Sequence, residues 1–129
     1  MSLPFDCEVE QCDYEDIAWQ KHEARREGVT MKPHKNAQWF KIGNMAFACL
    51  WEPGNFSNRG RMAHCFVTQG CRGQGMGKRL VKARVSYAED NGYDAIDTYA
   101  FNPDLFSRLG FVELNKYDNG TYYMVKSLD

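Results

Sequence analysis

The sequence of 129 residues predicts a single α/β (α+β) domain, spanning residues 1–129. We expect a mixed, mostly antiparallel central sheet of about six to seven strands, flanked by about three helices. Strand-like runs rich in aromatic and β-branched residues recur along the chain. Two pairs of these runs are joined by short Gly/Asn turns, and one long segment with helical spacing lies between two strand-like runs.

The first half of the chain predicts a strand, a helix and three antiparallel strands. Acidic residues open a helix near Asp13, and Gly28 ends it. Gly43 and Asn44 separate two β-prone runs, which is typical of a hairpin. The run 61–68 is apolar on both alternating faces, so it should lie at the centre of the sheet. The expected elements are a strand at 5–9, a helix at 13–28, strands at 38–42 and 45–51, a loop at 53–60 and a strand at 61–68.

The second half predicts a long helix, a strand, a short helix and a hairpin. Apolar residues recur at helical spacing after Met76, and Asn91 with Gly92 stops the helix. Pro103 is suited to the first turn of the short helix, and Gly120 lies in the turn of the hairpin. The expected elements are a helix at 76–90, a strand at 93–101, a helix at 103–110 and strands at 111–117 and 121–127.

The composition favours a cytoplasmic protein without membrane or nucleic-acid partners. The longest apolar run, 45–51, is far shorter than the roughly 20 residues of a membrane span, and the first residues lack the pattern of an export signal. The net charge of −1 gives no long-range attraction to nucleic acid. Five cysteines include no Cys-x-x-Cys pair, so we expect reduced thiols and no metal site.

Residues 70–80 combine four glycines with three cationic side chains, between a predicted strand and a predicted helix. A Walker phosphate loop would need glycine where Arg72 stands, and a dinucleotide fingerprint would need glycine where Lys78 or Leu80 stands. Both patterns are therefore excluded. A helix that begins near Gly75 would still point unpaired N–H groups and the positive end of its dipole outward, so the backbone of this segment could hold a phosphate group.

A third pattern, Arg/Gln-x-x-Gly-x-Gly/Ala, fits residues 72–77 at every position. With this match the sequence resembles the GNAT acetyltransferase superfamily. Val67 stands where that family ends its central strand on an apolar residue. Residues 106–111 resemble the family's Tyr-x-x-Leu-Gly-Phe turn, and Asn102 stands where the family often has asparagine. The resemblance extends over about residues 38 to 126.

The resemblance implies that the anion is the diphosphate of acetyl-CoA, which would act as co-substrate. Its pantetheine arm would lie between the strands at 61–68 and 93–101 and pair with main-chain groups, as an added strand would. Because Gly73, Gly75 and Gly77 have no side chains, the backbone there would be accessible to the cofactor. The residues that the resemblance assigns to the cofactor are Phe66, Val67, Thr68, Arg72, Gly73, Gln74, Gly75, Met76, Gly77, Lys78, Asn102 and Phe106.

The resemblance also implies that an amine attacks the thioester directly. The ammonium form, with an ordinary pKa of about 10.4, must lose a proton, and the candidate bases are His64 on the central strand and Glu52 after the preceding strand. The family often has a tyrosine acid at the place of Phe106, which cannot donate a proton. Tyr99 is a candidate substitute, although strand tyrosines more often serve packing.

The acceptor is weakly specified. Asp97, on the strand that follows the long helix, is a further carboxylate candidate for the base. His34, in the loop after the first helix, is a candidate for the acceptor side. Acidic residues at the start of the first helix would suit a cationic amine, although solvation and the helix dipole explain them as well. The acceptor is expected to be a small-molecule amine or a peptide or protein amine. The sequence leaves open whether the protein forms a homodimer. The expected function is an N-acetyltransferase. The alternative is a non-catalytic acyl-CoA-binding or partner-binding module, which Phe106 and the shortened helix after Asn102 would explain.

Overall fold

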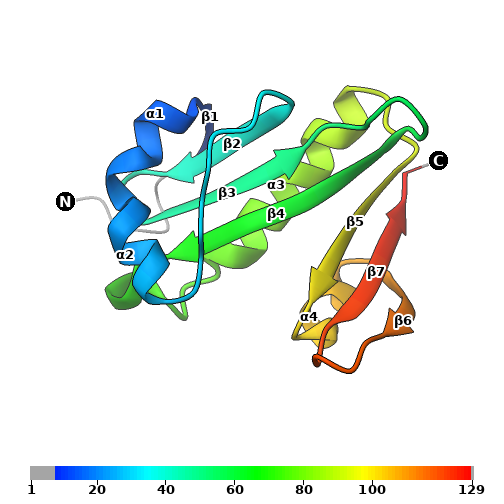
Figure 1. Ribbon diagram of the computed structural model, residues 1–129. Coiled ribbons are helices and arrows are strands. Elements are labelled where there is room, and N and C mark those ends of the chain that lie inside the picture. The colour runs from blue at the N-terminus through cyan, green and yellow to red at the C-terminus, as the bar shows by residue number, and fades with distance from the viewer. Residues whose placement is uncertain (1–7, 129) are drawn as a thin grey trace.

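The computed structural model describes residues 8–128, which form a seven-stranded sheet in the order β1-β2-β3-β4-β5-β7-β6 (Figure 1). All neighbouring strands are antiparallel except β4 and β5, which are parallel. The strands are β1 (Val9–Cys12), β2 (Ala37–Ile42), β3 (Ala46–Trp51), β4 (Arg59–Val67), β5 (Ala95–Ala100), β6 (Val112–Lys116) and β7 (Tyr122–Ser127). The helices are α1 (Tyr14–Ile17), α2 (Lys21–Arg26), α3 (Met76–Asp90) and α4 (Pro103–Arg108), with 3₁₀ turns η2 (Ala18–Gln20) and η3 (Gln69–Cys71).

The predicted fold class is confirmed, and so are both hairpins. β2 pairs with β3 from Ala37↔Trp51 to Ile42↔Ala46, around the turn that Gly43 and Asn44 predicted. β4 is the fourth of the seven strands in the sheet, as its apolar faces predicted. α3 has the predicted bounds, since the glycine-rich segment precedes it and Asn91 caps its end.

Two elements at the N-terminal end differ from the prediction. The first described strand is Val9–Cys12, and residue 8 before it is not in a strand; residues 5–7 of the predicted strand at 5–9 lie outside the described part of the chain. This short edge strand, Val-Glu-Gln-Cys, has no apolar alternation that could mark it. The predicted helix at 13–28 is interrupted by the 3₁₀ turn Ala18–Gln20, so α1, η2 and α2 form one irregular helical segment.

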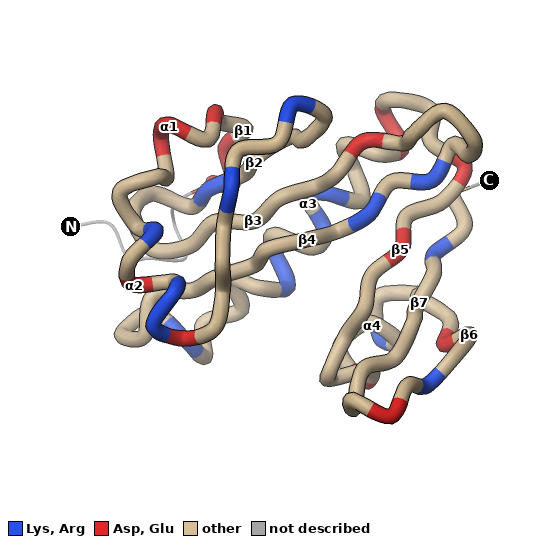
Figure 2. The backbone as a smooth tube through the Cα atoms, viewed as in Figure 1, with Lys and Arg blue, Asp and Glu red and all other residues tan. Residues whose placement is uncertain are grey.

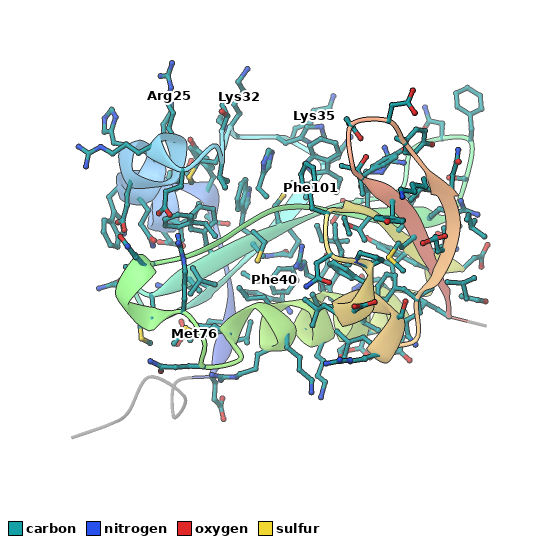
Figure 3. All side chains as sticks on the ribbon, turned by 90° about the horizontal axis from the view of Figure 1, so that it is seen from below. Arg25, Lys32, Lys35, Phe40, Met76 and Phe101 are labelled. Carbon is teal, nitrogen blue, oxygen red and sulfur yellow. The ribbon has the colours of Figure 1, made fainter. Side chains whose placement is uncertain are left out.

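Two apolar cores lie on opposite faces of the sheet. On one face α3 packs over side chains such as Phe40, Leu50 and Ile96, and Figure 3 shows Phe40 between the sheet and this helix. On the other face the helical segment α1–α2 packs over Trp39 and Phe47, among others. That segment covers the β2–β4 side only, so the outer face of β5 and β7 is left open (Figure 1).

Charges of both signs are spread over the molecule (Figure 2). Acidic residues gather at α1, and basic residues lie along α3. Among the described residues, no helix combines the length and the apolar character that crossing a membrane requires.

Candidate active site

The parallel pairing of β4 with β5 is short. It ends at Arg61↔Asp97, which is the last of three residue pairs within the described part of the chain. β4 continues along β3 as far as Val67. The backbone of residues 62–67 therefore has no strand partner on the β5 side, and we call this segment the unpaired edge of β4. Figure 1 shows β4 running toward α2 while β5 turns away toward α4.

A β-bulge interrupts β4 within this edge. Cys49 pairs with Ala63 and Ala48 pairs with Cys65, so His64 is an extra residue in the strand. Its φ of 36° makes it the one residue other than glycine with positive φ among those described. Such a backbone is strained for a residue with a side chain, and a bulge bends its strand and redirects the neighbouring groups.

The bulge places the His64 ring between two tryptophans. Its ring is stacked on Trp39, with centroids 6.1 Å apart and planes 5° apart, and it meets Trp51 edge-on at 5.9 Å. Trp39 and Trp51 belong to the core on the face opposite α3. Burial lowers the pKa of His64 below its ordinary value of 6.5, because the charged imidazolium loses solvation there. His64 is thus a neutral imidazole near pH 7, able to accept a proton.

The glycine-rich segment after β4 forms an open backbone cradle. Gly73 and Gly75 have φ values of 80° and 78°, and Gly75 is the N-cap residue of α3. A β-carbon placed on Gly73, Gly75 or Gly77 would have no neighbour within 4 Å in the part of the chain that the structure describes. The Met76 side chain is buried beneath the cradle, whereas Gln74 and Lys78 are exposed. The cradle therefore presents the first N–H groups of α3 to solvent, where an anion can bind them.

Arg72 anchors the cradle to the rest of the fold. Its Nε donates a hydrogen bond to the Val67 carbonyl at 2.9 Å, and its Nη2 pairs with Glu27 at the end of α2. The guanidinium also lies over the Phe66 ring, 5.8 Å from its centroid. Arg72 thus joins the end of β4, the cradle and α2.

The residues predicted to line the cofactor arm lie at the C-terminal end of β4. The Phe66 side chain is buried in the core opposite α3, and Val67 packs toward α3. Only their main-chain groups are therefore available to a ligand at the strand edge. The Thr68 hydroxyl is buried and has no hydrogen-bond partner among residues 8–128. A buried hydroxyl without a partner is unusual, and a polar group of a bound ligand would satisfy it.

Asn102 and Phe106 lie further away, at α4. Asn102 is the exposed N-cap residue of that helix, and its side chain makes no capping hydrogen bond. Phe106 packs edge-on against Phe111, with ring centroids 5.4 Å apart, beside the core under α3.

The other two predicted catalytic residues lie on different faces of the sheet. The Glu52 carboxylate accepts a hydrogen bond of 3.2 Å from the Tyr87 hydroxyl of α3. Tyr99 is 47% exposed and alternates along β5 with Ile96 and Ala100, which face α3. It therefore points to the opposite face, which is the face that carries His64. The structure brings Tyr99 and His64 to one face, whereas the Glu52 carboxylate bonds to Tyr87 of α3, although Glu52 also lines the cavity described below.

A buried carboxylate marks the point where β4 and β5 part. Asp97 is only 2% exposed and accepts hydrogen bonds from Arg61 Nε at 3.0 Å and from the Tyr123 hydroxyl at 2.7 Å. Arg59 in turn donates to the Tyr123 oxygen at 2.8 Å. The bond to Asp97 raises the pKa of Arg61, and burial followed by the bond to Asp97 raises the pKa of Tyr123. The Asp97 carboxylate, a candidate base in the sequence, is thus engaged in an ion pair with Arg61.

A cavity of about 480 Å³ opens at this network. Asp97 and Tyr123 point into it from the face opposite α3, because their strand neighbours Ile96 and Met124 face α3. Its lining residues are Trp51, Glu52, Ser57, Arg59, Arg61, Asp97 and Tyr123. Since Trp51 also touches His64, the cavity and the imidazole are neighbours. His34, predicted for the acceptor side, stacks on Trp51 with ring centroids 5.3 Å apart.

The sequence did not mark Arg59, Arg61 or Tyr123 as site residues. Their positions depend on the register between β4, β5 and β7, which joins segments far apart in the chain. The one available signal was the position of Arg61 as the first residue of the predicted central strand, directly before its apolar residues.

Comparisons with known proteins point to one family. The model of the Acetyltransferase (GNAT) family matches residues 4–111. Among curated proteins, no sequence matches this chain. Among solved structures, the ribosomal-protein-S18-alanine N-acetyltransferase from Escherichia coli is similar with a TM-score of 0.74 and 15% identity, over 94% of this chain and 93% of that one.

Two further similar structures contain coenzyme A. A GNAT family N-acetyltransferase from Escherichia coli in complex with CoA has a TM-score of 0.65 and 20% identity, over 95% of this chain and 82% of that one. The N-acetylglutamate synthase from Neisseria gonorrhoeae, complexed with CoA and N-acetyl-glutamate, has a TM-score of 0.67 and 16% identity over 94% of this chain. This chain covers only 35% of that synthase. At such identities the likeness establishes the fold.

Proposed function

The chain belongs to the acetyltransferase (GNAT) family, and from this premise we propose that it is an N-acetyltransferase that moves an acetyl group from acetyl-CoA to a primary amine. The observation that carries the proposal is the unpaired edge of β4, which begins where the pairing with β5 ends at Arg61↔Asp97 and leads to the glycine cradle. An arm with amide groups can pair with the edge while its diphosphate binds the cradle.

The residues present fit this cofactor. The open space over Gly73, Gly75 and Gly77 leaves room for a diphosphate on the N–H groups of the cradle, and Lys78 adds positive charge nearby. The Thr68 hydroxyl, which has no partner, offers a hydrogen bond at the start of the arm. When bound, acetyl-CoA supplies an acetyl group activated as a thioester.

His64 is the proposed proton acceptor. It lies within the unpaired edge of β4, on the same face of the sheet as the cavity, and it is neutral near pH 7 because burial lowers its pKa. It would take the proton of the attacking amine directly or through one water. Glu52 is the weaker candidate, because its carboxylate is bonded to Tyr87 on the α3 side.

The main chain and Tyr99 complete the proposed site. N–H groups of the unpaired edge would stabilise negative charge on the acetyl oxygen, as backbone donors do in oxyanion holes. Phe106 cannot act as an acid, so Tyr99 is the proposed proton donor, with its ring on the cavity side of β5, 5.0 Å from the Tyr123 ring.

The acceptor would enter from the cavity at Arg61 and Asp97. A cavity of about 480 Å³ that is open to solvent suits a small amine or the end of a peptide chain. The names of two similar enzymes are consistent with acceptors of these two kinds, the ribosomal-protein-S18-alanine N-acetyltransferase and the N-acetylglutamate synthase.

The alternative is a non-catalytic acyl-CoA-binding module, which the phenylalanine at position 106 favours. The deciding experiment measures thiol release from acetyl-CoA in the presence of amino acids, polyamines, aminoglycosides and peptides with a free amino terminus. We expect at least one class to accelerate release. Tight binding of acetyl-CoA without acceleration by any amine would overturn the proposed catalysis in favour of the binding module.

A further inference from the structure

Arg84 is a buried cation that the proposed chemistry does not use. It lies in the middle of α3, and its side chain is 2% exposed. Its Nε donates to the Leu80 carbonyl of its own helix at 3.1 Å. Within residues 8–128, no carboxylate lies within ion-pair distance of its guanidinium, and the thiols of Cys65 and Cys49 lie near it.

This arrangement is costly for the fold alone. Burial lowers the pKa of Arg84, since the guanidinium loses its hydration without gaining a counter-ion. Its helical neighbours Leu80 and Ala88, four residues before and after, are fully buried apolar residues. An apolar side chain at 84 would continue the same stripe and serve the core as well. The presence of a guanidinium therefore calls for a role beyond packing.

The contacts of Arg84 show what the guanidinium holds. Its Nη1 donates to the Cys49 carbonyl of β3 at 3.1 Å and to the Ala63 carbonyl of β4 at 3.4 Å. Cys49 and Ala63 are paired residues, and the register between the strands shifts immediately next to them because of the bulge at His64. Arg84 thus ties α3 to both strands at the place where β4 departs from regular pairing.

Cys65 connects this contact with the unpaired edge of β4. Its strand partner Ala48 lies in the core under α3, so Cys65 also faces α3. Cys65 is nevertheless exposed, although it lies on a central strand and near buried Arg84. Solvent must therefore reach it from the β5 side, where β4 has no partner. Through the Ala63 carbonyl, Arg84 is in direct contact with the segment that would receive the thioester.

We propose that Arg84 is a positioning residue of the acyl-transfer site, which fixes the bulge at His64 and thereby aims the backbone of residues 62–67 at the cofactor arm. This inference rests on the proposed function and extends it to a residue on the opposite side of the sheet from His64. A misplacement of reacting groups by about 1 Å can cost about a hundredfold in rate, so a fixed bulge has a large effect on turnover.

The test uses two variants. Arg84→Gln keeps N–H donors for the two carbonyls but loses the charge and shortens the side chain. Arg84→Lys keeps the charge but loses the planar set of N–H donors of the guanidinium. Lys82→Gln, an exposed change on the same helix, is the matched control. For each full-length variant, hydrogen exchange of the peptide that covers 62–67, CoA affinity by calorimetry, and kcat and KM for acetyl-CoA are measured.

Both Arg84 variants should speed exchange at 62–67 but not in β2, and kcat should fall about ten- to a hundredfold. CoA affinity should fall by a smaller factor, because the glycine cradle is unchanged. Unchanged exchange at 62–67 would overturn the proposal, as would equal losses in kcat, CoA affinity and global stability, which a merely structural role would produce. If no amine is a substrate, exchange and CoA binding still decide the positioning role, while the proposed function alone fails.

Discussion

Gly75 determines whether the start of α3 can hold a diphosphate. With φ at 78° and no atom within 4 Å of the place that a β-carbon would take, it leaves the first N–H groups of the helix uncovered. A side chain there would be strained and would also occupy the anion's place. The chain offers a matched position in Gly92, at the other end of α3, with φ at 73° and the same open surroundings.

We predict that Gly75→Glu abolishes the thermal stabilisation that CoA confers, because it adds both bulk and negative charge to the cradle. Gly92→Glu should carry a similar backbone penalty, on the order of 1 kcal/mol, and retain the stabilisation by CoA. Differential scanning fluorimetry with and without CoA measures both. Equal stabilisation of the two variants by CoA would place the diphosphate elsewhere.

His64 links the pH dependence of activity with that of stability. Its pKa in the folded protein lies below the ordinary value of 6.5 because of burial. As the pH falls, the unfolded chain therefore takes up the proton before the folded one. The stability contributed by neutral His64 is complete above about 6.5 and is lost as the pH falls through the lower, folded pKa.

We predict that kcat/KM with a weakly basic amine, which stays neutral over the range, rises with pH through an apparent pKa below 6.5 and then levels off. His64→Gln should lower kcat about a hundredfold or more and remove the acid limb of the profile, that is, the rise of kcat/KM with pH. His34→Gln, which changes the other imidazole against Trp51, is the control and should retain the limb. A limb that persists in His64→Gln would exclude His64 as the base.

The junction of β4 and β5 is the element on which the site depends. The buried Asp97 joins Arg61 of β4 to Tyr123 of β7 at the last residue pair before the strands part. The network lies where the unpaired edge of β4 begins. It also forms one wall of the cavity, so the same contacts define the cofactor side and the acceptor side.

We predict that Tyr123→Phe lowers the free energy of unfolding by about 1–2 kcal/mol, because a buried carboxylate loses a hydrogen bond. Tyr99→Phe removes a hydroxyl from a neighbouring, half-exposed ring and should change that free energy by less than about 0.5 kcal/mol. Urea unfolding of both variants measures the difference. Equal effects would mean that the Asp97 network adds nothing to the junction.

Local patterns along the chain predicted most elements, because turns and caps are encoded by adjacent residues. Gly43 with Asn44 marked one hairpin, and Asn91 with Gly92 marked the end of α3. The 3₁₀ turn at 18–20 left no such mark. β1 was placed too early, since a four-residue edge strand has too few residues to show a period.

The site was predictable in its backbone part and less so in its side chains. The spacing of residues 72–77 located the cradle, because the glycines act through their own backbone. The partners of Asp97 depend on strand register across distant segments, so spacing could not supply them. Arg84 falls on the buried stripe of α3 with Leu80 and Ala88, which could have indicated a buried cation, but its contacts with β3 and β4 could not be read from the chain.

At the scale of the whole molecule, the two substrates would approach from opposite faces of one sheet. The cradle and α3 lie on one face, and the cavity with His64 lies on the other. The place where β4 and β5 separate connects the two faces of the sheet. All other neighbouring strands, from β1 to β6 in the sheet order, are joined by backbone pairing. Figure 1 shows this division of the sheet into two halves. The open outer face of β5 and β7 leaves the cavity accessible to an acceptor.

A crystal structure with bound CoA tests this account most directly. We predict that the diphosphate accepts hydrogen bonds from the N–H groups of residues 73–77 and that the pantetheine arm pairs with residues 62–67 of β4. A diphosphate bound away from the start of α3, or an arm that leaves residues 62–67 unpaired, would contradict it.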